Sequence, residues 1–215
     1  MSQARRFALL GPPASGKGTQ GRLLAERLGI AYLSTGAELR RAIEEETKLG
    51  LQAKAFLDAN QYIPDDLAID MVQSWVGAHP GGWLLDGFPR STPQAKAICG
   101  EGEFAISPFT SEDPLIIIHL EVSADALRGR VSTRRECGSC GASTTSAHQL
   151  CPKCGSSDLE ARRDDSETGF ESRLKAYQTL TVPALEFLRS HTKVLTVDGN
   201  GSREEVAHAI AQQLN

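Results

Sequence analysis

Short apolar runs alternate along the chain with longer segments rich in good helix formers. These runs do not alternate strictly between apolar and polar residues, a pattern typical of strands that are buried on both faces of a parallel sheet. Because strands that alternate with helices indicate βαβ units, we expect an α/β fold in three layers around a five-stranded parallel sheet. The expected strands are Phe7–Leu10, Ala31–Leu33, Trp83–Leu85, Leu115–Leu120 and Val194–Val197.

The segments between these strands favour helices, and two stretches break the pattern. Gly100–Asp113 is rich in Gly, Ser, Pro and Phe, which indicates a loop or irregular insertion without an assigned role. Cys137–Asp158 has too little apolar content for a core of its own, and we expect a small lid that needs a metal to fold. The expected helices are Lys17–Leu28, Ala37–Glu46, Asp65–Val76, Ala124–Arg135, Glu171–Arg189 and Glu204–Leu214.

Size and charge narrow the classes of protein to which the chain can belong. Its 215 residues predict one full domain with a small insert. The net charge of −4 argues against binding nucleic acid by bulk attraction, and no apolar run is long enough to cross a bilayer. The N-terminal apolar run of about four residues is too short for a secretory signal. We therefore expect a cytoplasmic protein with no nucleic-acid or membrane partner.

The clearest motif is a glycine-rich loop between the first expected strand and the first expected helix. It reads Gly11-Pro-Pro-Ala-Ser-Gly-Lys17 and continues with Gly18 and Thr19, the pattern of a P-loop in its required context. The backbone N–H groups, the positive end of the helix and the Lys17 ammonium can together hold the terminal phosphates of a nucleotide. The expected phosphate-binding residues of the loop are Gly11, Ala14, Ser15, Gly16, Lys17, Gly18 and Thr19.

A second motif, Asp86-Gly-Phe-Pro-Arg90, follows the third expected strand. A carboxylate at the end of a buried strand can hold Mg²⁺ through water, because this ion gives up its hydration shell reluctantly. Asp86 is the candidate for that role. Taken alone, an Asp before a Gly is also a common turn former.

With these two motifs, the chain resembles the adenylate kinase family of nucleoside monophosphate kinases. The segments Leu33–Arg40 and Ile63–Asp65 are similar to two further motifs of that family, and all four motifs occur in the order of the family. The resemblance covers essentially the whole chain and implies a P-loop NTPase-type fold. It also implies a monomer that catalyses ATP + AMP ⇌ 2 ADP with Mg²⁺.

The resemblance assigns roles to individual residues. Arg130 and Arg134 would bind ATP, and the catalytic set would be Lys17, Arg90, Arg134, Arg162 and Arg173. For any single arginine, a solvated helix face or an ion pair with Asp164 or Asp165 is the alternative. The implied AMP-binding residues are Thr35, Gly36, Arg40, Ile63, Gly87, Arg90, Gln94, Arg162 and Arg173.

Four of the five cysteines form two CxxC pairs. In a reducing compartment this spacing is typical of a structural Zn²⁺ site, with disulfides or free thiols as alternatives. The spacer between the pairs is shorter than in four-cysteine lids of the family. We expect a core at 1–129 and 166–215, which contains the monophosphate-binding segment 34–64, and a zinc lid at 130–165. The expected zinc ligands are Cys137, Cys140, Cys151 and Cys154.

Three positions depart from the family pattern: Ala14 and Thr133 replace glycines, and Ala37 replaces an Asp thought to order water around magnesium. An acceptor other than AMP, such as UMP, CMP or GMP, is the main alternative. A zinc-ribbon protein that uses ATP as a switch is a weaker one, because the sequence between the outer lid cysteines has a single Lys153 and no Phe, Trp or Tyr.

Overall fold

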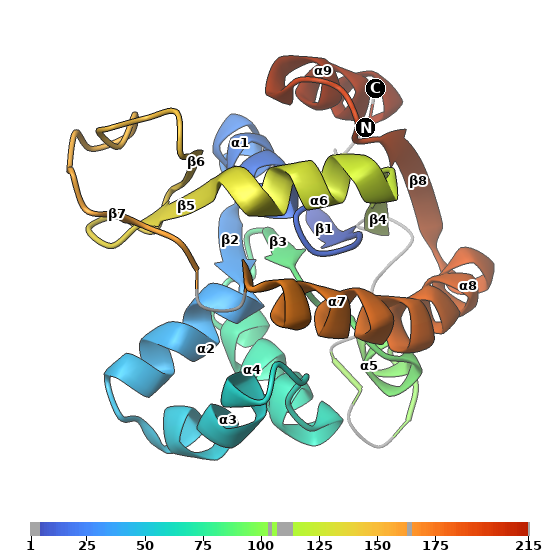
Figure 1. Ribbon diagram of the computed structural model, residues 1–215. Coiled ribbons are helices and arrows are strands. Elements are labelled where there is room, and N and C mark those ends of the chain that lie inside the picture. Colours follow the sequence, from blue (N-terminus) through green and yellow to red (C-terminus); the bar gives the residue numbers. More distant parts are fainter. Residues whose placement is uncertain (1–4, 103–104, 107–113, 163–164, 215) are drawn as a thin grey trace.

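The computed structural model describes residues 5–102, 105–106, 114–162 and 165–214. Five parallel strands form the central sheet in the order β2-β3-β1-β4-β8, which confirms the expected fold class (Figure 1). The strands are β1 (Arg6–Leu10), β2 (Ala31–Ser34), β3 (Trp83–Asp86), β4 (Leu115–Glu121) and β8 (Lys193–Asp198).

Side chains of the central strands point alternately into two apolar clusters, one on each face of the sheet. On β4, Ile117 joins the cluster that contains Trp83 and Leu188, whereas Ile116 and Ile118 join the cluster that contains Leu24. Burial on both faces explains why these strands lack polar alternation in the sequence. The arrangement is the three-layer α/β sandwich that the pattern predicts.

Helices cover both faces of the sheet. α1 (Lys17–Leu28) and α9 (Arg203–Leu214) cover one face, and α4 (Asp65–Gly77), α5 (Thr92–Ile98) and α8 (Val182–His191) cover the other. Figure 1 shows these two layers above and below the sheet.

Two further pairs of elements frame the carboxyl end of the sheet. α2 (Thr35–Glu44) and α3 (Lys48–Asp58) form a helical pair beside α4, and α6 (Ala124–Thr133) and α7 (Glu167–Ala176) lead to and from a small projecting sheet (Figure 1). That sheet is antiparallel, in the order β6-β5-β7. It contains β5 (Arg134–Cys137), β6 (Ser143–Thr145) and β7 (Leu159–Glu160), and we call residues 134–160 the lid.

The structure adds two helices that the sequence pattern did not predict. α3 has Gly50 in its first turn, which weakens its helical pattern, and it is capped by Thr47, whose Oγ1 accepts a hydrogen bond from Gly50 N at 3.2 Å. α5 has only seven residues and buries Ala95, Ala97 and Ile98. Helices this short depend on tertiary packing more than on intrinsic propensity.

Several predicted helices differ from the structure: the one expected from Glu171 begins at Glu167, and the one expected over Ala37–Glu46 spans Thr35–Glu44. Two differences are larger. The helix expected over Ala124–Arg135 ends at Thr133, and Arg134 begins β5. The helix expected over Glu171–Arg189 is interrupted by a π-helical turn at Tyr177–Thr181. Pro183 follows this turn and has no N–H to donate to an earlier carbonyl, which explains the interruption.

Two other features complete the description. Most of the predicted Gly100–Asp113 loop lies outside the described residues, while Ile106 is buried in the core. Within the described part of the chain, none of the helices has the length and apolar character to span a bilayer.

Candidate functional site

A cavity of about 700 Å³ opens at the carboxyl ends of the central strands. Parallel strands all end at the same edge of a sheet, so loops that are distant in the sequence meet there. The cavity is lined by the P-loop, the start of α2, the loop after β3, the lid and α7. The P-loop, the loop after β3, the start of α2 and the lid therefore contribute to one site.

The P-loop turns tightly between β1 and α1. At Gly11 (φ 151°) a Cβ atom would lie 2.8 Å from the carbonyl oxygen of Leu120, so the neighbouring strand leaves no room for a side chain. The Lys17 Nζ donates hydrogen bonds to Gly11 O at 2.8 Å and Pro12 O at 2.7 Å. These contacts hold the ammonium across the mouth of the loop, where phosphate oxygens could replace the carbonyls.

The electrostatic environment of Lys17 disfavours its charge. Desolvation lowers the pKa of Lys17 to about 7, although the Asp86 carboxylate opposes this effect. The guanidinium groups of Arg90, Arg134 and Arg173 lower the pKa further. A site crowded with cations is suited to a polyanion, whose binding would restore the charged form of the lysine.

Ala14, where the family pattern has glycine, adopts a left-handed conformation with φ 63°. This conformation is unfavourable for a residue with a Cβ. The methyl group packs against the small cluster formed by Leu127, Val131 and Phe170, which offsets the strain. The substitution therefore leaves the turn of the loop intact.

Asp86 lies at the end of β3, directly beside Leu9 of β1. Its Oδ2 accepts a hydrogen bond from the Tyr32 hydroxyl at 2.8 Å, and burial next to this carboxylate raises the pKa of Tyr32. Both Asp86 and the neighbouring Gly18 line the cavity. A carboxylate beside a P-loop is suited to hold a hydrated Mg²⁺ ion.

The Arg90 side chain lies folded against its own loop. Its Nε donates to Gly87 O at 2.6 Å, and its guanidinium lies 4.6 Å from the centre of the Tyr62 ring. At Gly87 (φ 84°) a Cβ would lie 2.6 Å from Arg90 Nη2, so this position requires glycine. Arg90 is thereby oriented into the cavity together with Gly36 of α2.

Three arginines connect elements around the cavity through ion pairs and hydrogen bonds. Arg134 and Arg173 both bind the carboxylate of Asp165, which is almost completely buried. Arg130 donates to Ser15 O at 3.3 Å and to Gly199 O at 2.7 Å, so it connects the P-loop with the turn after β8. Arg134 and Arg173 therefore line the cavity and are also ion-paired with Asp165, although such an ion pair was considered above as an alternative to a role in the site.

Arg40 and Arg162 meet at a single carboxylate. Arg40 Nη2 lies 3.2 Å from Glu136 Oε1, and Arg162 Nε lies 3.3 Å from Glu136 Oε2. The three side chains come from α2, the segment after β7 and β5, and all line the cavity. α2 and the lid are therefore joined in this structure.

The residues expected to contact the AMP base lie deeper. The Thr35 hydroxyl donates to Asp86 O and Gly87 O, both at 3.1 Å, and Gln94 Nε2 donates to Asp65 Oδ1 at 2.8 Å. Thr35, Ile63 and Gln94 are buried, and they are not among the described residues that line the cavity. Their contact with the base stays a prediction.

The cavity residues missed in the sequence include Tyr62, Glu136 and His148, and Asp165 was considered only as an alternative ion-pair partner of an arginine. Asp165 contacts its arginines only after the chain folds. Glu136 stands beside Cys137 and was passed over because this stretch of sequence was interpreted as part of the metal motif. His148 follows β6, and its Nδ1 lies 3.0 Å from the Thr144 hydroxyl. Tyr62 directly precedes the Ile63–Asp65 motif. This position next to a motif is the feature of the sequence that could have identified Tyr62 as a cavity residue.

The four lid cysteines converge as the spacing predicts. Their Sγ atoms lie within 4.8 Å of one another, with Cys137–Cys154 and Cys140–Cys151 each at 3.6 Å. Four sulfur atoms bonded to one Zn²⁺ at about 2.3 Å in a tetrahedron lie about 3.8 Å apart. Backbone N–H groups of Cys154 and Lys153 help lower the pKa of Cys151, whereas hydrogen bonds with the other thiols raise the pKa of Cys154. The thiols thus share their protons until a metal displaces them. The donor set fits zinc.

Comparison with known proteins agrees with this geometry. The adenylate kinase family model matches residues 9–193. The chain is 38% identical over 210 residues to an adenylate kinase of Methanocella arvoryzae, with 94% of each chain covered. It is 36% identical over 214 residues to an adenylate kinase of Clostridium tetani, with 96% of each chain covered. It is 34% identical over 214 residues to an adenylate kinase of Elusimicrobium minutum, with 97% of this chain and 98% of the relative covered.

Proposed function

The chain belongs to the adenylate kinase family, and we propose that it transfers the γ-phosphoryl group of ATP reversibly to AMP, giving two molecules of ADP. One observation carries this proposal: the P-loop, the loop after β3, α2, the lid and α7 all present cationic side chains to one cavity. Two polyanions can be held there face to face. This is what phosphoryl transfer requires of a protein.

The catalytic contribution of the chain is alignment and charge neutralisation. Lys17 and the P-loop amides hold the donor phosphates, Arg40 and Arg90 hold the acceptor phosphate, and Arg134, Arg162 and Arg173 surround the group in transit. Arginine suits these positions because its planar guanidinium stays charged and binds phosphate oxygens in pairs. Closure of the lid excludes water, which would otherwise accept the phosphoryl group.

Two metal ions complete the proposed enzyme. Asp86 would hold Mg²⁺ through water molecules, and the ion would supply positive charge to the donor phosphates. The four lid cysteines would hold Zn²⁺ in a closed shell, which stabilises the lid and takes no part in chemistry. The distances between their sulfur atoms support this assignment.

We propose AMP as the preferred acceptor and a monomer as the active form. The family resemblance at Thr35 and Gln94 supports AMP, and the resemblance over the whole chain supports the monomer. Coupled assays with AMP, UMP, CMP and GMP test the acceptor. Light scattering on the purified protein tests the oligomeric state.

The variant Lys17→Met tests whether the P-loop lysine is required for phosphoryl transfer. The variant should lose at least about a thousandfold in turnover, because the charge on the transferring phosphates is no longer balanced. Its circular dichroism spectrum should match that of the wild type. Turnover within about tenfold of the wild type would contradict the role given to the P-loop.

A further inference from the structure

His119 is a polar residue in the buried part of β4, which is otherwise apolar. It is paired with Leu10 of β1 on one side and with Thr196 of β8 on the other, and it is 5% exposed. It follows Ile117 by two residues, so its ring points to the face of the sheet that α8 covers. A buried polar side chain is costly unless it is hydrogen-bonded, so the contacts of this ring indicate what it does.

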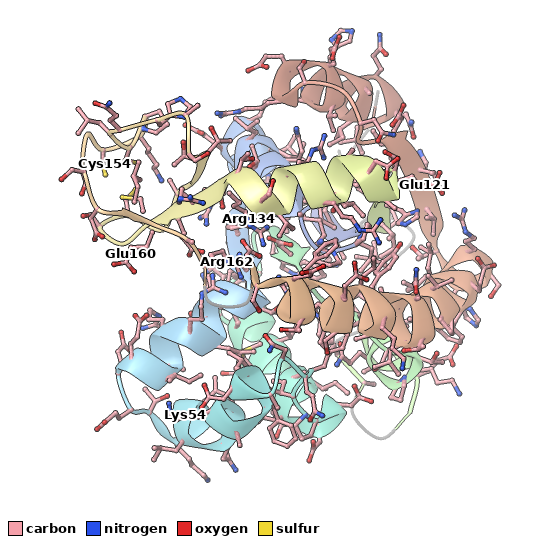
Figure 2. The ribbon with its side chains drawn as sticks, in the orientation of Figure 1. Lys54, Glu121, Arg134, Cys154, Glu160 and Arg162 are labelled. Carbon is pink, nitrogen blue, oxygen red and sulfur yellow. The ribbon has the colours of Figure 1, made fainter. Side chains whose placement is uncertain are left out.

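One nitrogen of the His119 ring has a hydrogen-bond partner, and the other has a negative charge nearby. Nε2 lies 2.8 Å from the hydroxyl oxygen of Tyr177. Nδ1 has no hydrogen-bond partner among the described residues and lies 3.6 Å from Glu121 Oε1. Glu121 stands at the end of β4, beside the start of α6 (Figure 2).

These surroundings decide which nitrogen carries the proton. Burial raises the pKa of Tyr177 to about 12, so this hydroxyl keeps its proton and can donate a hydrogen bond. Burial lowers the pKa of His119, and although the Glu121 carboxylate opposes this shift, the ring is neutral at pH 7. The charges of Arg189 and Lys17 also lower the pKa. A proton on Nδ1 faces the carboxylate, which would repel a lone pair there, so Nε2 is the acceptor and Tyr177 the donor.

Tyr177 stands in the middle of a row of cavity residues. Arg173, Tyr177 and Thr181 are spaced by four residues along α7 and the π-helical turn, and all three line the cavity. At one end of the row, Arg173 binds the buried carboxylate of Asp165. At the other end, the Thr181 hydroxyl donates to Arg90 O at 2.9 Å. The row therefore connects one cavity arginine with the backbone of the loop that carries another.

The row passes from an α-helix into the π-helical turn at Tyr177. The N–H of Val182 donates to Tyr177 O, five residues earlier, which is the spacing of a π-helix. This conformation is rare, so its place in the chain depends on tertiary contacts. His119 connects the first residue of the turn to β4, and Thr181 connects the last residue to the loop after β3.

We propose that His119 is a positioning residue for phosphoryl transfer. By accepting a hydrogen bond from Tyr177, it fixes the start of the π-helical turn, and with it the placement of Arg173 relative to Arg90. The proposed function assigns these two guanidinium groups to the group in transit and to the acceptor phosphate. The inference rests on that function and extends it to a residue of β4 that is not among the described residues lining the cavity.

The competing explanation is a purely structural histidine, which would affect stability and leave the chemical step unchanged. Rapid-quench measurement of a single turnover separates the two, because it reports phosphoryl transfer apart from product release. Leucine fills the space but accepts no hydrogen bond, so His119→Leu should slow the transfer about tenfold through misalignment of the guanidinium groups. The KM values for ATP and AMP should stay within about twofold, because binding of the ground state is little changed.

Rescue by a conservative variant is the second part of this test. The side-chain amide oxygen of glutamine can reach the position of Nε2 and accept the same hydrogen bond. The single-turnover rate of His119→Gln should therefore stay within about threefold of the wild type. A His119→Gln variant as slow as His119→Leu would contradict the role given to the hydrogen bond.

Substitution of the donor completes the kinetic comparison. Tyr177→Phe should lose about as much as His119→Leu, and the double variant should lose no more than either single variant, because one interaction is removed in all three. His79→Leu is the matched control. The His79 ring also has a hydrogen-bond partner, with Nδ1 2.7 Å from Trp75 O, but it is not among the described residues that line the cavity. Its loss should leave the rate within about twofold.

Nitrogen-15 NMR of the histidine side chains tests the hydrogen bond itself. At pH 8 the wild type should show His119 with a proton on Nδ1 and none on Nε2, its signals being identified by their absence from His119→Gln. In Tyr177→Phe the Nε2 signal should move toward that of an imidazole nitrogen without a donor. His79→Leu should leave the signal in place.

The possible failures are distinguishable. Wild-type protein that forms no ADP from ATP and AMP would overturn the proposed function. An active wild type with a His119→Leu variant of unchanged single-turnover rate would overturn the positioning role, whatever the melting temperature of the variant. A proton on Nε2 would overturn the assigned direction of the hydrogen bond. Tyr177→Phe keeps the aromatic ring in place and provides the same kinetic test if His119→Leu does not fold.

Discussion

The two sides of the cavity are stabilised by different means. The core side rests on two apolar clusters that enclose β1, β3 and β4. On the lid side, the buried apolar side chains of residues 134–160 are those of Cys137 and Cys151. The difference shows that one chain can stabilise its phosphate site by burying hydrocarbon and its lid by gathering thiols.

The largest expected effect is on the core side. Ile117 is fully buried at the centre of β4, and Ile117→Ala should lower the free energy of unfolding by about 3–4 kcal/mol. The cause is the cavity left between β4 and the helices that cover it. Urea denaturation followed by circular dichroism measures the loss. A change below about 1 kcal/mol would contradict the claim that the core is tightly packed.

Removal of the proposed zinc ion should affect the lid more than the core. A strong chelator should lower the melting temperature of the wild type by about 4–8 °C, equivalent to about 2 kcal/mol. Hydrogen exchange should accelerate in β5 and β6 and stay unchanged in β4. In Cys154→Ser, which already lacks one ligand, the chelator should have a much smaller effect. Equal melting of metal-free and zinc-loaded wild type would refute the stabilising role of the metal.

A protonation change should occur at Lys17 on the core side when ATP binds. With a pKa of about 7, this lysine is largely neutral at pH 8 in the nucleotide-free protein. Phosphates favour the ammonium and raise its pKa, so binding should take up about one proton at pH 8 and progressively less below pH 7. Calorimetry in buffers of different ionisation enthalpy measures this uptake. The same uptake in Lys17→Met would assign the proton to another group.

The smallest effect should follow from a polar substitution on the lid. Leu150 is a large apolar residue that is 57% exposed, so Leu150→Ser removes little buried surface. The melting temperature should change by less than about 2 °C. A larger decrease would show that the lid depends on apolar packing, and it would weaken the contrast with the core.

Much of the fold followed from local patterns. The five strands of the central sheet were predicted because burial on both faces leaves a continuous apolar signature. α3 and α5 were missed because the first carries Gly50 in its first turn and the second has seven residues. The interruption at Tyr177–Thr181 was missed because a π-helical turn has no strong signature beyond the Pro183 that follows.

The residues of the candidate site also include some that local sequence predicts and some that it does not. The P-loop residues, Asp86 and the four cysteines stand close together in the sequence, in spacings that chemistry makes recognisable. The acidic partners of the arginines are far from them in the sequence and have no recognisable spacing. Asp165 binds Arg134 from 31 residues away, and Glu136 reaches Arg40 across 96.

The sequence by itself determined the three-layer fold, the phosphate loop and the thiol cluster of this protein, because each depends on residues close to one another along the chain. Only the tertiary structure decided which carboxylate holds which arginine and that α2 meets the lid. Ion pairs between distant segments depend on where the strands and helices bring their ends, and this information is absent from local composition and spacing.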